Sequence, residues 1–295
     1  MTRSAEGFLF GLLGVLGFSL TLPATRLAVA ELDPVFVGLG REVAAAALAA
    51  PLLALTRQPW PSAAQWGGLL TVIVGVVLGF PILTAVAMGR VDASHGAVVL
   101  GLLPMATALA GFLLNHERPS RAFWLAAAIG SAAVIVYAFG AGAGHLQGAD
   151  LALLGAVVAG AMGYAAGARL ARELGAWQVI CWAVALASPL LLPIVAWLAW
   201  RHGLHASLRA WGGFGYVSAV SAFLGFFAWY RGLERGGVAR VSQVMLLQPF
   251  LTLCFAALLL GERITLLATA CALIVAASIA ASRRAAVHHR IPAST

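Results

Sequence analysis

Long uninterrupted runs of apolar residues follow one another along most of this chain of 295 residues, and they constrain its fold more than any other feature. A helix needs about 20 apolar residues to cross the hydrocarbon core of a bilayer. Only 9% of the residues are charged, whereas a soluble domain carries roughly 25%. Because so few charges cannot cover a water-facing surface, most of the surface is expected to face lipid. Continuous runs such as Leu69–Val77 also favour helices over the alternating pattern of a β-barrel.

Divided at Arg, Asp, Glu, Pro and Gly, the apolar runs predict an all-α integral membrane protein with ten transmembrane helices. Their ranges are 7–30, 35–55, 64–88, 93–114, 121–140, 149–170, 176–199, 210–232, 237–260 and 264–282. The loops that remain are too short to fold as a soluble domain, so the function is expected to lie inside the membrane.

Arginine positions predict the orientation, because cytoplasmic loops are enriched in positive charge. All 18 basic residues are arginines. With the N-terminus inside, twelve of them lie on the inner side, five on the outer side, and Arg41 lies within a helix. Both termini are therefore predicted to be cytoplasmic. The net charge of +8 is spread over the loops rather than gathered on one face, so no nucleic-acid partner is expected.

The chain also contains an internal repeat, which appears when it is shifted by 145 residues against itself. Residues 102–107 then fall on 247–252, and Glu117-Arg118 falls on Glu262-Arg263. This predicts a first five-helix repeat over 1–140, a second over 149–283, and a cytoplasmic tail over 284–295. Since five is an odd number, the second repeat must be inverted in the membrane relative to the first. Inverted repeats are typical of transporters, which place their site between the two halves.

At these residues the sequence resembles the drug/metabolite transporter superfamily, in its EamA-type branch. The resemblance is carried by a proline in the fourth helix of each half, followed by Gly261-Glu262-Arg263 in the second half and by Glu117-Arg118, without the glycine, in the first. Gly40-Arg41-Glu42 is a further match. Within the superfamily the chain is most similar to YddG-type amino-acid exporters of bacterial inner membranes. The resemblance implies a central cavity lined by the first, third, fourth, sixth, eighth and ninth helices, with the fifth and tenth outside.

Candidate substrate-binding residues are the polar and aromatic side chains deep within the predicted spans, because a small metabolite needs a few hydrogen-bonding groups and apolar walls. They are Ser19, Thr21, Phe80, Thr84, His95, Tyr164, Phe226, Trp229, Tyr230, Ser242, Gln243 and Gln248. Single Ser and Thr residues in membrane helices more often bond their own backbone or a neighbouring helix. Trp and Tyr at span ends more often lie in the membrane interface.

Three further groups of residues have predicted roles. Pro23, Pro81, Pro104 and Pro249 are expected to kink their helices and to act as hinges in gating. Arg41 and Glu42 are charges within a span, so either they form a structural ion pair or they couple transport to protons. Glu117 and Glu262 lie at span ends and are expected to cap the helix that follows each of them.

The function predicted from these features is export of a small metabolite, most plausibly an amino acid, by alternating access of the two halves. A drug or nucleotide-sugar carrier of the same superfamily is one alternative. A lipid-modifying enzyme and a channel or scramblase are alternatives of other classes. The sequence contains no motif for catalysis, ATP binding or a metal, so no cofactor is expected. Besides its solute and membrane lipid the chain is expected to need no partner and to act as a monomer.

Overall fold

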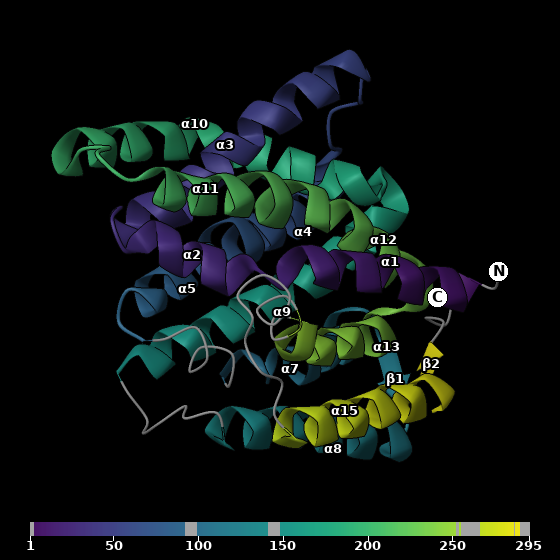
Figure 1. Ribbon diagram of the computed structural model, residues 1–295. Coiled ribbons are helices and arrows are strands. Elements are labelled where there is room, and N and C mark those ends of the chain that lie inside the picture. Colours follow the sequence, from purple (N-terminus) through teal and green to yellow (C-terminus); the bar gives the residue numbers. More distant parts are fainter. Residues whose placement is uncertain are drawn as a thin grey trace.

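The computed structural model of the chain describes residues 3–91, 99–140, 148–251, 254, 266–285 and 287–289 (Figure 1). The elements of the first half are α1 (Arg3–Phe18), α2 (Thr21–Val29), α3 (Pro34–Leu55), η1 (Ala63–Gln65), α4 (Trp66–Val72), η2 (Ile73–Gly79), α5 (Phe80–Met88), α7 (Leu103–Leu114), β1 (Glu117–Pro119) and α8 (Arg121–Gly140). Those of the second half are α9 (Ala149–Leu174), α10 (Ala176–His202), α11 (Leu208–Tyr216), η3 (Val217–Leu224), α12 (Gly225–Gly236), α13 (Val238–Ser242), η4 (Gln243–Leu247), α15 (Leu266–Arg284) and β2 (Val287–His289).

Within the described residues, six helices are long and apolar enough to cross a membrane, which confirms a helical membrane protein. They are Arg3–Val29, Pro34–Leu55, Ala63–Met88, Ala149–Leu174, Ala176–His202 and Leu208–Gly236. Shorter apolar helices cover Leu103–Leu114, Arg121–Tyr137 and Thr269–Ser282. Parts of the predicted fourth and ninth spans lie outside the described residues, namely 93–98, 252–253 and 255–260. The count of ten therefore stays a prediction.

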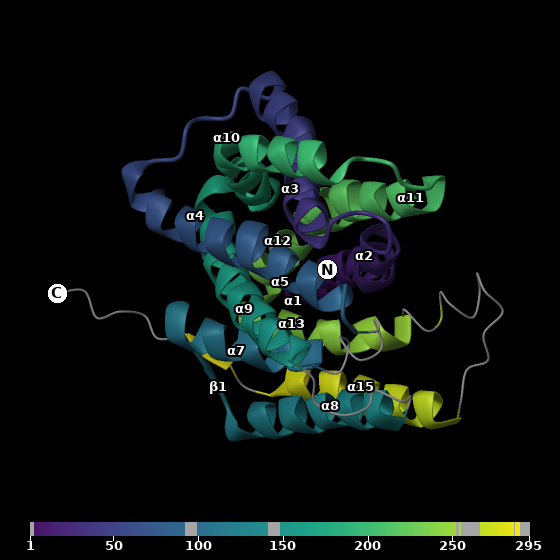
Figure 2. The same ribbon diagram turned by 90° about the vertical axis from the view of Figure 1, so that its left-hand side faces the viewer.

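The helices pack in long pairs that join the two halves of the chain. α1 runs along α12, α3 along α10, and α9 along the continuous helix formed by α4, η2 and α5. α8 and α15 lie together at one edge of the bundle in both views (Figures 1 and 2). The core therefore lies between the two sequence halves rather than within either one.

Glycines let α1 and α12 approach closely. A Cβ atom on Gly232 would lie 2.6 Å from the backbone nitrogen of Gly11, and one on Gly14 would lie 3.0 Å from the backbone of Trp229. In the same way, Gly75 on η2 lies against the backbone of Gly163 on α9. Small residues favour helix contact in a membrane because backbones can then touch directly.

Several helices are irregular near the middle of the bundle. The first span is interrupted at Ser19–Leu20, four residues before Pro23, which donates no backbone hydrogen bond. The π-helical segment η2 ends two residues before Pro81, and the 3₁₀ segment η4 ends two residues before Pro249. Pro104 lies in the first turn of α7. A second π-helical segment, η3, interrupts the eighth predicted span without any proline.

Glu117 caps a helix, but not the one that was expected. Its Oε1 accepts a hydrogen bond from the backbone nitrogen of Val238 at 2.8 Å, and its Oε2 from that of Ala239 at 2.7 Å. The capped helix is thus α13, in the other half of the chain, rather than the following α8. The cause is that β1 carries Glu117 across the end of the bundle, where it pairs antiparallel with β2. Glu262 lies outside the described residues.

At the opposite end of the bundle, Glu31 in the loop between α2 and α3 connects this loop to the start of α11. The backbone nitrogen and the hydroxyl of Ser207, the N-cap of α11, donate to its two carboxylate oxygens at 2.6 and 2.7 Å. These hydrogen bonds hold the pKa of Glu31 below its ordinary value.

Candidate functional site

The interruption of the first span leaves backbone carbonyls that accept hydrogen bonds from side chains of other helices. Tyr216 Oη donates to the carbonyl of Gly17 at 2.9 Å, and Gln248 Nε2 donates to that of Phe18 at 3.1 Å. Just past the interruption, the hydroxyls of Thr21 and Ser221 lie 2.8 Å apart and are buried. Polar contacts therefore join three helices at one break. At membrane depth, irregular backbone is tolerated where it is buried in protein or lines a cavity.

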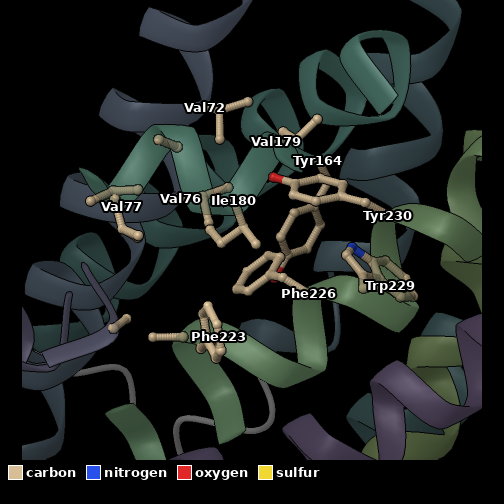
Figure 3. Packing of buried hydrophobic residues seen from close by; sticks show 14 of the residues in the cluster. Val72, Val76, Val77, Tyr164, Val179, Ile180, Phe223, Phe226, Trp229 and Tyr230 are labelled. Atoms are coloured by element: carbon tan, nitrogen blue, oxygen red, sulfur yellow. The ribbon is translucent and has the colours of Figure 1, made fainter. Parts of the chain in front are cut away.

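An aromatic cluster lies against this break. Its members, all buried, are Phe18, Tyr164, Phe226, Trp229 and Tyr230. The ring of Phe18 lies 5.1 Å from that of Phe226 and 6.1 Å from that of Trp229. Tyr164 lies 5.5 Å from Trp229, and Phe226 lies 5.4 Å from Tyr230. Figure 3 shows how Tyr164 of α9 faces the three aromatic side chains of α12.

Two polar atoms of this cluster have no hydrogen-bond partner among the described residues. They are Trp229 Nε1 and Tyr230 Oη, and both are fully buried. A buried donor without an acceptor costs about 1–3 kcal/mol, so natural proteins rarely leave one in place. The cluster therefore contains two buried donors whose acceptors the described residues do not supply.

Arg41 and Glu42, the charges predicted deep within the second span, are both buried in α3. Arg41 Nε donates to Glu42 Oε1 at 2.8 Å, and the two residues are 4% and 1% exposed. The structure therefore shows a buried ion pair at this point. This geometry is compatible with both predicted roles of the pair, which are to stabilise the bundle and to couple transport to protons.

A second polar group connects the fourth and ninth predicted helices. Ser242 Oγ and Gln243 Nε2 both donate to the carbonyl of Pro104, at 3.2 and 3.4 Å. Gln243 is fully buried, and its Oε1 has no partner among the residues that the structure describes. Of the predicted residues, this group thus contains Ser242, Gln243 and the hinge residue Pro104.

The remaining predicted residues are placed differently. Ser19 donates to its own helix at the carbonyl of Val15, 2.6 Å away, and Thr84 donates to that of Phe80 at 2.7 Å. Their hydroxyls therefore bond the backbone, as single Ser and Thr residues in membrane helices commonly do. Phe80 is half-buried, and His95 lies outside the described residues.

Two residues at the break, Phe18 and Tyr216, and one buried polar residue elsewhere, Asn115, were not selected from the sequence. Phe18 was missed because an apolar aromatic residue in an apolar span carries no signal. Tyr216 was missed because it lies near a span end, where Tyr usually marks the interface. Asn115 was missed although it is polar. Its Nδ2 donates to the carbonyl of Ala165 at 3.1 Å, while its Oδ1 has no partner in the described part of the chain.

No group of three or more His, Cys, Asp or Glu side chains among the described residues could hold a metal ion. The site instead offers aromatic faces, free hydrogen-bonding groups and one buried ion pair at an interrupted helix. Together, the apolar helices and their buried packing define an integral membrane protein of the helical class.

The chain belongs to the EamA-like transporter family of the drug/metabolite transporter superfamily, whose sequence model matches residues 5–139 and again 147–283. It is 42% identical over 284 residues to a protein of Bacillus subtilis (strain 168) named "Uncharacterized transporter YdeK", covering 96% of this chain and 99% of that one. A solved structure described as "Crystal structure of protein" matches with a TM-score of 0.79 at 17% identity, over 96% of this chain and 99% of that chain. At this identity the likeness shows a common fold.

Proposed function

We propose that the protein is a secondary transporter that exports small metabolites, with amino acids as its substrate class. The observation that carries this proposal is the buried aromatic cluster with its two unpaired donors, Trp229 Nε1 and Tyr230 Oη, beside the interrupted first span. A binding site for a small molecule needs apolar walls and a few oriented polar groups, and this cluster supplies both.

An amino acid fits the chemistry of the cluster at both of its charged ends. Its carboxylate would accept hydrogen bonds from Trp229 Nε1 and Tyr230 Oη, which lack acceptors. Its ammonium group would find acceptors in the backbone carbonyls at the helix break, where Gly17 and Phe18 already accept bonds from side chains. The aromatic rings would enclose an apolar side chain. Glu42, which is buried and paired with Arg41, is the residue proposed to couple export to protons.

We further propose that the protein has ten transmembrane helices, arranged as two inverted repeats of five, and that it works by alternating access. The double match of the family supports this arrangement. So do the π-helical segments, because Ile73–Gly79 falls within η3, Val217–Leu224, when shifted by 145 residues. The pairing of α1 with α12 mirrors that of α9 with α4, η2 and α5, as two-fold symmetry requires.

The proposed location is the bacterial inner membrane, with both termini in the cytoplasm. The start of α1 and the strands β1 and β2 lie at the same end of the bundle (Figure 1). Arg118 in β1 and Arg235 in the last turn of α12 belong to this end as well. Such an excess of arginine is typical of the cytoplasmic side.

Flux through the purified protein tests the function. Proteoliposomes would be loaded with each of a panel of radiolabelled amino acids, and efflux would be followed with and without a proton gradient. We expect at least one amino acid to leave the proteoliposomes faster than it leaves loaded liposomes without protein. Its efflux is expected to be faster still when the proton gradient is applied. If none does, while nucleotide sugars or cationic drugs do, the amino-acid assignment is wrong. If no solute in the panel moves, the transporter site proposed here is wrong.

Replacing Trp229 with phenylalanine is expected to raise the half-saturating concentration of the transported amino acid about 5- to 150-fold, because the solute loses a buried hydrogen bond worth about 1–3 kcal/mol. The variant keeps an aromatic ring but leaves a cavity where the pyrrole part of the fully buried indole was, so thermal unfolding is measured alongside transport. Trp200→Phe is the matched control, because Trp200 is 83% exposed. A Trp229→Phe protein that folds and transports with unchanged affinity would exclude Trp229 from the site.

A further inference from the structure

A pocket of about 270 Å³ lies away from the aromatic cluster, where the ends of three helices meet. Its lining residues are Arg3, Arg172, Glu234 and Arg235. Arg3 begins the described part of α1, Arg172 lies in the last turn of α9, and Arg235 lies in the last turn of α12. α1, α9 and α12 also carry the aromatic cluster, so the pocket lies beyond it at the arginine-rich end of the bundle.

Part of the positive charge at this pocket is balanced by two carboxylates. Arg231 lies 3.3 Å from Glu234 and 3.7 Å from Glu6, and Arg235 lies 3.8 Å and 3.9 Å from the same two residues. Although Glu234 is near, Arg235 Nε is buried and makes no hydrogen bond within the described residues. These four side chains form one network in which two arginines face two glutamates.

Arg3 and Arg172 are not balanced in this way. Neither makes a hydrogen bond or an ion pair with any residue that the structure describes. Together with the balanced network, the pocket therefore carries two positive charges in excess. A concave site with two free guanidinium groups, and an N–H of a third without an acceptor, is suited to an anion.

Helix dipoles do not explain the placement of all three arginines. The C-terminal ends of α9 and α12 attract positive charge, so Arg172 and Arg235 are favourable there without any ligand. Arg3 is at the opposite kind of end, the N-terminal turn of α1, where the dipole disfavours a cation. A bound anion would stabilise all three, because guanidinium groups bind carboxylate and phosphate oxygens in a two-pronged geometry.

We propose that this pocket is an anion site for a phosphate or carboxylate group. Two sources can supply such a group at the end of a membrane helix bundle: the headgroup of an acidic phospholipid and a free solute. Acidic headgroups are attracted to clustered arginines next to the membrane. The site is separate from the aromatic cluster, and the proposal does not depend on which solute the protein transports.

Binding to the full-length purified protein tests the proposal. Retention of phosphatidylglycerol against phosphatidylcholine would be measured by native mass spectrometry, and inorganic phosphate and glutamate would be tested by the shift in thermal unfolding. The test variant is Arg3→Gln/Arg172→Gln. Because neither side chain has a partner in the described structure, the variant is expected to fold normally. Arg209→Gln is the control, because Arg209 is exposed in α11, near the other end of the bundle.

We expect the double variant to bind the anion about 30-fold more weakly, which corresponds to losing two surface arginines, and the control to bind it unchanged. Preference for phosphatidylglycerol that phosphate cannot displace would identify a lipid headgroup site. Stabilisation by phosphate or glutamate alone would identify a site for a free anion. If neither anion binds, or if the double variant binds as tightly as the unmodified protein, the pocket is not an anion site.

Discussion

Replacing Glu42 with alanine, with Arg41 left in place, is expected to lower the free energy of unfolding by about 3–5 kcal/mol, because a buried charge loses its partner. The Arg41–Glu42 pair is almost fully enclosed and is joined by a hydrogen bond of 2.8 Å. In the interior of a membrane protein the unpaired guanidinium can reach neither water nor a headgroup without moving the helix. The loss would be measured by unfolding of the purified protein in mixed micelles.

Removing both charges together separates the cost of an unpaired charge from the value of the pair. We expect Arg41→Met/Glu42→Leu to be far more stable than Glu42→Ala, since replacing a buried pair by apolar residues of similar size is often neutral. Glu6→Ala is a control for a partly exposed ion pair, because the Glu6 side chain is 30% exposed. This variant is expected to change the free energy of unfolding by less than about 1 kcal/mol. Equal losses in the single and double variants would contradict this reading of the pair.

Replacing Glu117 with alanine is expected to lower the free energy of unfolding by about 3–6 kcal/mol, since each of two charge-assisted hydrogen bonds contributes roughly 1.5–3 kcal/mol. Its carboxylate is 1% exposed and holds the first two backbone N–H groups of α13. Without it, both donors stay buried and unpaired. The measurement is the same unfolding assay in mixed micelles.

Two further variants sharpen this prediction. Glu117→Gln retains one acceptor oxygen without the charge, so about half of the loss is expected. Glu173→Ala serves as the control, because Glu173 is an exposed carboxylate near the end of α9. A stability of Glu117→Ala within about 0.5 kcal/mol of the control, the usual range of a surface substitution, would show that the cap between the halves contributes little.

Much of the fold could be predicted from the sequence, because the thickness of a bilayer sets the length of an apolar helix. The apolar runs gave the helices of the first three and the sixth to eighth predicted spans. The prolines indicated irregular backbone, and the first span is interrupted four residues before Pro23. The π-helical segment η3 was not predicted, since no proline or other local signal accompanies it.

The partners of the buried polar residues could not be predicted. Glu117 was recognised as a helix cap, but its helix lies 121 residues further along the chain. Nothing in the residues around Glu117 specifies a contact at that separation. The strand β2, which pairs with β1, falls in the stretch that was expected to be only a tail.

The sequence indicated several members of the aromatic cluster but not how they meet. Tyr164, Phe226, Trp229 and Tyr230 were all selected from the sequence, and the structure brings them together. Their meeting point depends on the pairing of α9 with α12, which hydrophobicity alone does not determine.

The central claim, that the interrupted first span lines a site opened in turn to each side of the membrane, is tested most directly by labelling a cysteine at position 21. Thr21→Cys would be made in a protein whose Cys181, Cys254 and Cys271 are replaced by alanine, and a membrane-impermeant maleimide would be added from either side. Leu208→Cys, at a position that is 89% exposed in α11, is the control for one-sided access. We predict that Thr21→Cys reacts from both sides and that the transported solute slows the reaction. Reaction from one side only, or at a rate that the solute does not change, would contradict the account.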